Sequence, residues 1–356
     1  MDQLPTILPE GYEVVQRLGA GQTAVVWLAR AARGGPPLAL KMPRPEAAGD
    51  AVLRRMFENE VQITLKLEHP NVVRAFDGRP TGAGAFLALE YCAGGTLDQL
   101  LLEQGKLPLD QALALVRDVA SGLEHAHDQR VLHRDVKPAN VFLSEDGIAK
   151  LGDFGTGTFA AEVSQERVGT AFYMAPEIFG GGPPSMQSDI YSLGVLAYEV
   201  LAGVRPFLGE SYDALMVAHM TALPRDLRRY RPDLPRRLSA VVTRAMSRDA
   251  GRRFQSVRAF MEAYREATGE APSQTAQPTA GAPVTGRSGR SPTPPPHDPL
   301  ATSVEPSTSA DVADERAARR SQVGGRAPDG DRPAGAEPTE PAKRRGLFGF
   351  LRRRGR

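Results

Sequence analysis

Two short stretches decide the fold of this chain: HRDVKPAN at His133–Asn140 and DFG at Asp153–Gly155, which begins thirteen positions after the asparagine. The first stretch places an aspartate, a lysine and an asparagine on one loop, and the second adds another aspartate. Carboxylate and amide oxygens suit Mg²⁺, and a lysine balances phosphate charge. Together these groups can hold a Mg²⁺-bound triphosphate against a hydroxyl group.

The two stretches resemble the catalytic loop and the metal-binding loop of the eukaryotic-like (Hanks-type) serine/threonine protein kinases found in bacteria. The resemblance implies that Asp135 accepts or orients the proton of the substrate hydroxyl, and that Lys137 stabilises charge on the transferred phosphoryl group. It also implies that Asn140 and Asp153 hold Mg²⁺ or Mn²⁺. Tyrosine kinases of this family usually lack the lysine, so serine and threonine hydroxyls of proteins are the expected acceptors.

A β-hairpin with a glycine turn is predicted near the N-terminus, and its turn contains Leu18, Gly19, Ala20 and Gly21. β-branched residues flank the turn on both sides, whereas a Rossmann or Walker loop would run into a helix. A kinase glycine loop of this kind covers the phosphates of ATP. A plain hairpin turn is the alternative, and Ala24 stands where the family has a third glycine.

The next predicted strand, Leu38–Lys41, ends in a cation. A lone lysine on a strand usually only keeps an edge strand soluble. Its position about twenty residues after the glycine turn resembles the family's strand lysine, which implies that Lys41 contacts the α- and β-phosphates. In the same comparison Val26 and Ala39 cover the adenine from above, and Phe142 covers it from below.

A helix is predicted over 53–67, because its apolar positions recur every three or four residues before a His-Pro-Asn stop. In the family this helix carries a glutamate that pairs with the strand lysine. Counting back from the stop selects Glu60, with Glu58 as the alternative on another side of the helix. Thr64 departs from the family pattern, which has an apolar residue there.

An apolar strand is predicted over 85–92, and it ends at a pair of glycines. It resembles the hinge that joins the two lobes of a kinase. The resemblance implies that backbone groups of Glu90 and Cys92 bond to adenine and that Leu89 is the gatekeeper residue. Cys92 is interpreted as a small buried filler rather than a redox sensor.

The stretch from Asp153–Gly155 to Ala175–Glu177 occupies the position of the activation segment. Thr170 matches the threonine that lines the acceptor site and bonds to the catalytic aspartate and lysine. Ser164 is the first candidate for autophosphorylation, and Thr158 is the second.

Arg134 precedes the catalytic aspartate, and kinases with an arginine there often use it to bind an activation-segment phosphate through charge-assisted hydrogen bonds. The alternative is that Glu162 and Glu166 already supply the negative charge.

Two structural residues of the family pattern follow later in the chain. Asp189 is expected to anchor the catalytic-loop backbone, and Glu177 is expected to form a buried ion pair with Arg253.

The resemblance implies an α+β, two-lobed protein-kinase-like fold, with a small β-rich N-lobe, a mainly helical C-lobe, and ATP with Mg²⁺ between them. Composition sets the limits of this domain. Residues 271–341 are mostly Pro, Ala, Gly, Ser and Thr, and such a stretch buries too little apolar surface to offset chain entropy. The expected parts are a kinase domain at 11–267 (N-lobe about 11–91, C-lobe about 93–267), a disordered linker at 268–340 and a basic, hydrophobic segment at 341–356.

The segment at 341–356 places Leu347, Phe348, Phe350 and Leu351 between two clusters of basic residues. It suits an anionic membrane surface or another acidic partner, and a solvated tail is the alternative. Specific nucleic-acid binding is not expected. The single cysteine and the lack of a signal-like or membrane-spanning apolar run predict a cytoplasmic protein, with this segment as a contact to the inner membrane face.

The sequence is also compatible with two rival functions. A catalytically inactive scaffold could bind nucleotide and recruit partners through the tail, although all five expected active-site residues are present: Lys41, Glu60, Asp135, Asn140 and Asp153. A kinase of small molecules is the other rival. The segment with Thr170 and Ala175–Glu177 disfavours it, because this segment shapes a peptide-binding site in the family.

Overall fold

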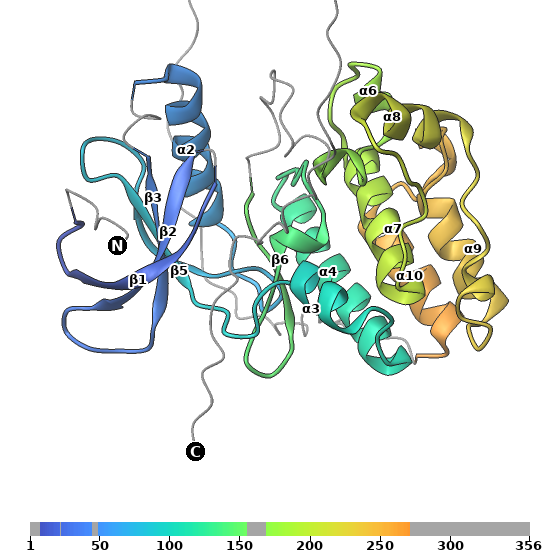
Figure 1. The fold of residues 1–356 in the computed structure, drawn as a ribbon, viewed down its shortest axis with the longest axis horizontal. Coiled ribbons are helices and arrows are strands. Elements are labelled where there is room, and N and C mark those ends of the chain that lie inside the picture. Colours follow the sequence, from blue (N-terminus) through green and yellow to red (C-terminus); the bar gives the residue numbers. More distant parts are fainter. Residues whose placement is uncertain (1–7, 22, 45–48, 155–168, 271–356) are drawn as a thin grey trace, which may run out of the picture. The chain divides into compact units, whose positions relative to one another are not determined.

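The structure is a computed structural model that describes residues 8–21, 23–44, 49–154 and 169–270. These residues belong to one compact unit of the chain, and they form two lobes (Figure 1). In the described residues the first lobe is a β-sheet with one helix, and the second is mainly helical with one short hairpin. The predicted α+β, two-lobed fold is therefore confirmed. The expected tail from residue 271 onward lies outside the described residues.

The sheet of the first lobe is antiparallel and has the strand order β1-β2-β3-β5-β4. Its helix, α2, begins after Asp50, whose carboxylate accepts a hydrogen bond from the Val52 N–H at 2.7 Å. The helix begins two residues earlier and ends three residues earlier than the pattern predicts. The elements are β1 (Tyr12–Ala20), β2 (Ala24–Ala31), β3 (Leu38–Pro43), α2 (Ala51–Thr64), β4 (Ala75–Arg79) and β5 (Phe86–Glu90).

Strand register places the expected nucleotide residues on one face of this sheet. Val26 pairs with Lys41, and Leu28 pairs with Ala39. Directly paired residues of antiparallel strands share a face, and alternate residues of one strand do too, so Val26, Ala39 and Lys41 point the same way. Ala24 belongs to the buried cluster that includes Phe57 of α2, so its methyl group takes part in packing where the family has glycine.

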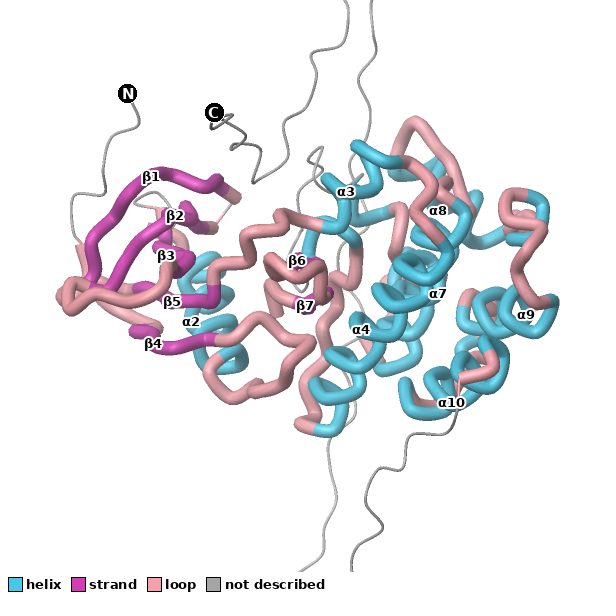
Figure 2. Tube along the Cα trace, turned by 90° about the horizontal axis from the view of Figure 1, so that it is seen from below, coloured by secondary structure: helices cyan, strands magenta, loops and turns pink. Residues whose placement is uncertain are grey.

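The second lobe is built around α7, in which every residue from Ser188 to Ala202 is buried. Ser185 and Ser188 form a capping box at its start, and Gly203 ends it at φ 73°. Helices α4 and α9 pack against α7, and α10 packs against both of them (Figure 2). The helices are α3 (Leu97–Gln104), α4 (Leu109–Asp128), α6 (Pro176–Phe179), α7 (Met186–Ala202), α8 (Tyr212–Thr221), α9 (Arg236–Ala245) and α10 (Val257–Thr268).

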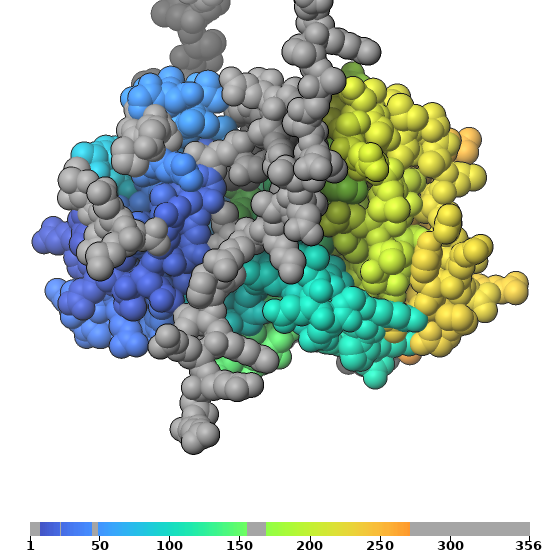
Figure 3. Space-filling view, in the orientation of Figure 1, coloured from blue at the N-terminus to red at the C-terminus, as the bar shows by residue number. Residues whose placement is uncertain are grey.

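A two-stranded hairpin and short 3₁₀ turns complete the described part of this lobe, namely β6 (Val141–Leu143), β7 (Ala149–Leu151), η1 (Pro138–Asn140), η2 (Leu227–Arg229) and η3 (Ala250–Arg252). In the space-filling view the blue first lobe and the yellow later helices lie on opposite sides, with teal and green surface between them in the lower part of the view (Figure 3). Within the described residues, none of the helices has the length and apolarity that crossing a membrane requires.

Candidate active site

Three distant segments meet at Lys41 on β3. Its Nζ donates to the Glu60 carboxylate on α2 and, at 3.0 Å, to Oδ1 of Asp153, two residues after β7. Lys41 and Glu60 are buried, whereas Glu58, the alternative partner, is half-buried elsewhere on the helix. The structure therefore selects Glu60 as the partner of Lys41, and it adds a bond to Asp153 that the sequence did not predict.

Burial and charge act against each other in this cluster. Burial lowers the pKa of Lys41, but the carboxylates of Asp153 and Glu60 outweigh it and raise that pKa above its ordinary value. Burial raises the pKa of Asp153, but the Lys41 ammonium holds it below its usual range. The pKa of Glu60 is raised by burial, against the effect of Lys41. Lys41 is therefore charged at neutral pH, and Asp153 is ionised beside it.

The catalytic loop forms a second cluster around Asp135. Lys137 Nζ lies 2.6 Å from Asp135 Oδ2 and donates to Thr170 Oγ1 at 2.8 Å. The Asn140 amide nitrogen donates to the backbone oxygen of Asp135 at 2.8 Å and to its Oδ2 at 2.9 Å. The expected contact of Thr170 with Lys137 is present, and it links the segment before α6 to the catalytic loop.

These bonds orient the groups that could hold a metal ion. Since the amide nitrogen of Asn140 donates to Asp135, its amide oxygen is the group left to act as a ligand. Asp153 supplies a carboxylate that is kept ionised. Both are hard oxygen donors, the type that Mg²⁺ and Mn²⁺ prefer, so the residues present fit the implied metal.

Buried hydrogen bonds fix the shape of the catalytic loop. Asp189 of α7 accepts hydrogen bonds from the backbone N–H of His133 at 2.9 Å and of Arg134 at 2.8 Å. It therefore anchors this backbone in the expected way. Arg134 is exposed and adopts φ 69°, and Asp153 adopts φ 60°. Such conformations are costly for residues other than glycine and cluster at functional sites.

His133 joins the catalytic loop to the segment that carries Asp153. Its Nε2 donates to the Gly152 carbonyl at 2.9 Å, and its Nδ1 accepts the backbone N–H of Asp135 at 3.2 Å. Full burial lowers the pKa of His133, so the ring is neutral, and these two bonds require the tautomer with the proton on Nε2. The neutral ring also packs on Phe154, with ring centroids 4.6 Å apart.

The expected hinge and glycine turn lie at the ends of the first lobe's strands. Leu18, Gly19 and Ala20 end β1, and the N–H of Gly21 donates to the Ala24 carbonyl at 2.8 Å, which closes the hairpin. Glu90 ends β5, and its carboxylate lies 3.1 Å from Lys150 Nζ on β7. The hinge strand is thus tied by an ion pair to the second lobe.

Cys92 follows the hinge strand and is partly buried. Burial, reinforced by the nearby Glu90 carboxylate, raises the pKa of its thiol to about 12. A thiol with so high a pKa is almost wholly protonated and a poor nucleophile at neutral pH, which favours the interpretation of Cys92 as a filler.

The comparisons with known proteins agree with this geometry. Residues 12–264 match the family model of the protein kinase domain. This chain belongs to the protein kinase family. It is 36% identical over 266 residues to the serine/threonine-protein kinase PknA of Corynebacterium glutamicum, covering 71% of this chain and 55% of that protein. It is 30% identical over 249 residues to PrkC of Bacillus subtilis, covering 69% of this chain and 38% of that protein.

Among solved structures, the PknI kinase domain of Mycobacterium tuberculosis is similar to this protein kinase, with a TM-score of 0.59 and 31% identity. The match covers 74% of this chain and 99% of that one. The chain spans about half the length, or less, of the curated relatives that it matches. The predicted resemblance to bacterial Hanks-type serine/threonine kinases is therefore confirmed.

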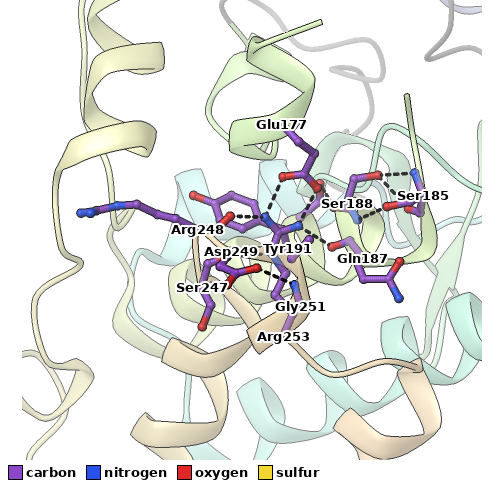
Figure 4. A network of polar contacts seen from close by, with 12 residues as sticks. Glu177, Ser185, Gln187, Ser188, Tyr191, Ser247, Arg248, Asp249, Gly251 and Arg253 are labelled. Carbon is purple, nitrogen blue, oxygen red and sulfur yellow. Dashed lines mark hydrogen bonds and ion pairs between the residues drawn. The ribbon is translucent and has the colours of Figure 1, made fainter. Parts of the chain in front are cut away.

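In the second lobe of this kinase, Arg253 forms the ion pair expected with Glu177, at 2.6 and 2.7 Å (Figure 4). The guanidinium also donates to the carbonyls of Ser247, Gln187 and Arg248, so all five of its N–H groups are used. Arg253 is fully buried, whereas the Glu177 side chain is 26% exposed. The pair is thus buried on the arginine side only.

From the sequence, Thr64 departs from the apolar residue of the family pattern, and Gly152 is not singled out. The structure shows that the Thr64 hydroxyl donates to the Glu60 carbonyl one helical turn earlier, at 2.7 Å, which satisfies a polar group at an apolar position. Ser164 and Thr158, the candidate phosphorylation sites, lie outside the described residues.

Proposed function

We propose that this protein kinase transfers the γ-phosphoryl group of ATP to serine and threonine hydroxyls of proteins. One observation carries the proposal: the fold brings together two clusters of hydrogen-bonded side chains. In the first cluster Glu60 and Asp153 both contact Lys41. In the second cluster Asn140 and Lys137 both contact Asp135. Phosphoryl transfer requires both groups of side chains. The similarity to bacterial serine/threonine kinases supports the same activity.

Each residue has a role that its environment suits. Lys41 presents a fixed positive charge to the α- and β-phosphates, and Glu60 holds its side chain in place. Asn140 and Asp153 would hold Mg²⁺ or Mn²⁺, which when bound neutralises charge on the phosphate oxygens. Asp135 orients the acceptor hydroxyl and takes its proton, while Lys137 stabilises the charge of the transferred group.

The adenine is held at the hinge by backbone groups of Glu90 and Cys92. Val26 and Ala39 cover one of its faces, because they share the sheet face of Lys41. Phe142 on β6 covers the other face, and the turn at Leu18–Gly21 covers the phosphates. We also propose that the activation segment is autophosphorylated, with Ser164 as the first candidate and Thr158 as the second. The exposed Arg134 is the residue that binds the phosphate.

A radiolabelled-ATP assay tests this function. The wild-type protein should label itself or a protein substrate on serine and threonine with Mg²⁺ or Mn²⁺, and Asp135→Asn should lower the rate about 10³-fold or more. Equal labelling of both proteins, or of neither with either metal, would contradict the proposal and favour an inactive scaffold.

We also propose that the protein acts in the cytoplasm and that 341–356 binds anionic membrane lipid at the inner face. The segment carries basic clusters on both sides of an apolar group, and each basic residue near an anionic surface contributes about 1 kcal/mol. A peptide of residues 341–356 should bind vesicles containing anionic lipid, and about 0.5 M salt should weaken the binding. Lack of binding at low salt would exclude the membrane and leave an acidic protein as the partner to test.

A further inference from the structure

Gly152 lies between the end of β7 and Asp153, and both of its backbone polar groups are occupied. Its N–H donates to the Asn140 carbonyl at 2.9 Å, and its carbonyl accepts from His133 Nε2 at 2.9 Å. These bonds tie the residue to the catalytic loop on both sides. The backbone at Gly152 therefore cannot shift without disturbing the loop that carries Asp135 or the neighbouring Asp153.

The missing side chain of Gly152 leaves room for an aromatic ring. A Cβ atom at this position would lie 2.8 Å from Cε2 and 3.0 Å from Cδ2 of Phe142, and 3.0 Å from Cγ2 of Val73. Carbon atoms in contact normally lie about 3.5 to 4.0 Å apart, so at least one neighbour would have to move.

Of the two neighbours, the Phe142 ring is the one that can move. Val73 is buried, and its N–H donates to the Leu151 carbonyl at 2.9 Å. The backbone of Phe142 is fixed in β6, where it pairs with Lys150 of β7, but its side chain is only half-buried. A side chain at position 152 would therefore turn the Phe142 ring toward its exposed side.

We propose that Gly152 is a positioning residue. Because it has no side chain, the Phe142 ring can lie parallel to the adenine and form the floor of the adenine pocket. The inference rests on the proposed function, in which Phe142 covers one face of the base. An aromatic ring binds a base best by stacking face to face with an offset, and this requires the ring to lie parallel to the base. Glycine at 152 and phenylalanine at 142 thus form a matched pair.

Equilibrium binding of a fluorescent ADP analogue to the full chain, with Mg²⁺, tests the inference. Gly152→Ala should raise the Kd about 5- to 20-fold, because the displaced ring occupies part of the space of the base. The KM for ATP should rise by a similar factor, and the KM for a peptide substrate should stay within about twofold of the wild-type value.

A second substitution distinguishes ring positioning from a general loss of structure. Phe142→Leu removes the atom that lies closest to the added methyl group, so Gly152→Ala combined with Phe142→Leu should bind the analogue within about twofold of Phe142→Leu alone. The matched control combines Gly152→Ala with Val73→Ala. It relieves the other close contact and should leave binding as weak as in Gly152→Ala.

Two outcomes would overturn the inference while leaving the proposed function intact: an unchanged Kd for Gly152→Ala, or a double variant whose defect is the product of the two single defects. If Gly152→Ala fails to fold, the double variant with Phe142→Leu decides. A folded double variant that binds like Phe142→Leu supports the inference, and an unfolded one contradicts it. A wild-type protein that does not bind the analogue would overturn the proposed function as well.

Discussion

The ion pairs at Lys41 and Arg253 illustrate two uses of charge in one domain. Arg253 is fully buried, and all five of its N–H groups donate to fixed oxygens. Lys41 is shared by two carboxylates from different segments, and in the described part of the chain Oε2 of Glu60 is buried without a hydrogen-bond partner. The arrangement around Arg253 is therefore saturated, which means that every donor has an acceptor. The arrangement around Lys41 is not, because one carboxylate oxygen has no donor in the described part of the chain.

The difference separates structural from functional charge. A saturated guanidinium has no donor left for a ligand, so its pair can only hold α6 to the loop before α10. A lysine beside two carboxylates keeps a high charge density that an incoming phosphate and metal can share. Substitutions at Arg253 should therefore change stability, and substitutions around Lys41 should change activity.

The largest expected effect is on catalysis at Asp153. Asp153→Asn keeps the shape of the side chain but removes the charge that would hold the metal, so kcat should fall about 10³-fold or more, or about 4 kcal/mol of barrier. The free energy of unfolding should change by about 1 kcal/mol or less. Asp146→Asn, on the exposed turn between β6 and β7, is the matched control and should keep kcat within about twofold. Equal activity of both variants would contradict this role.

The next effect is on stability at Arg253. Arg253→Met should lower the free energy of unfolding by about 3 to 5 kcal/mol, because it leaves the Glu177 carboxylate and three carbonyls without their donor. Urea denaturation measures this change. The neighbouring Arg252 has a side chain that is 82% exposed, and Arg252→Met should cost about 0.5 kcal/mol or less. Similar losses in the free energy of unfolding for the two variants would contradict the large stabilisation expected from the pair of Arg253 and Glu177.

A pH effect of intermediate size is expected at His219 on α8. The ring is fully buried, its Nδ1 lies 2.7 Å from the Tyr191 hydroxyl, and it packs against Phe179 and Phe207. Burial lowers the pKa of His219 to about 4. Below about pH 6.5 the unfolded chain binds a proton at this histidine, whereas the folded chain does not. The free energy of unfolding therefore decreases as the pH is lowered, by about 3 kcal/mol from pH 7 to pH 4.

Urea denaturation at several pH values tests this prediction. In His219→Gln the loss of stability between pH 7 and pH 4 should be about 3 kcal/mol smaller than in the wild type. The lowered pKa of His133 should account for part of the loss that remains. An identical pH dependence in wild type and variant would contradict the assignment.

The smallest effect is expected at Thr64. Among the described residues its hydroxyl bonds only within its own helix, to the Glu60 carbonyl, which is already part of the helix backbone. Thr64→Val keeps the volume of the side chain and should change the free energy of unfolding by about 0.5 kcal/mol or less, with kcat within about twofold. A large loss of kcat would show that the hydroxyl supports the position of Glu60.

The sequence predicted the fold because its short motifs resemble those of the kinase family and because local patterns mark individual strands and helices. The resemblance to the family's glutamate-bearing helix, together with the His-Pro-Asn stop, selected Glu60, and the glycine turn between β-branched runs predicted the hairpin of β1 and β2. The sequence could not show contacts between distant segments. The bond from Lys41 to Asp153 and the fit of Phe142 against Gly152 depend on how the lobes and strands pack, which no local pattern contains.

A crystal structure of the protein with Mg²⁺ and a non-hydrolysable ATP analogue would test the proposed active site most directly. We expect Lys41 Nζ within hydrogen-bond distance of the α- or β-phosphate, the metal bound by Asn140 and Asp153, and the base against Phe142. An analogue bound away from these residues, or a metal that neither Asn140 nor Asp153 contacts, would contradict it.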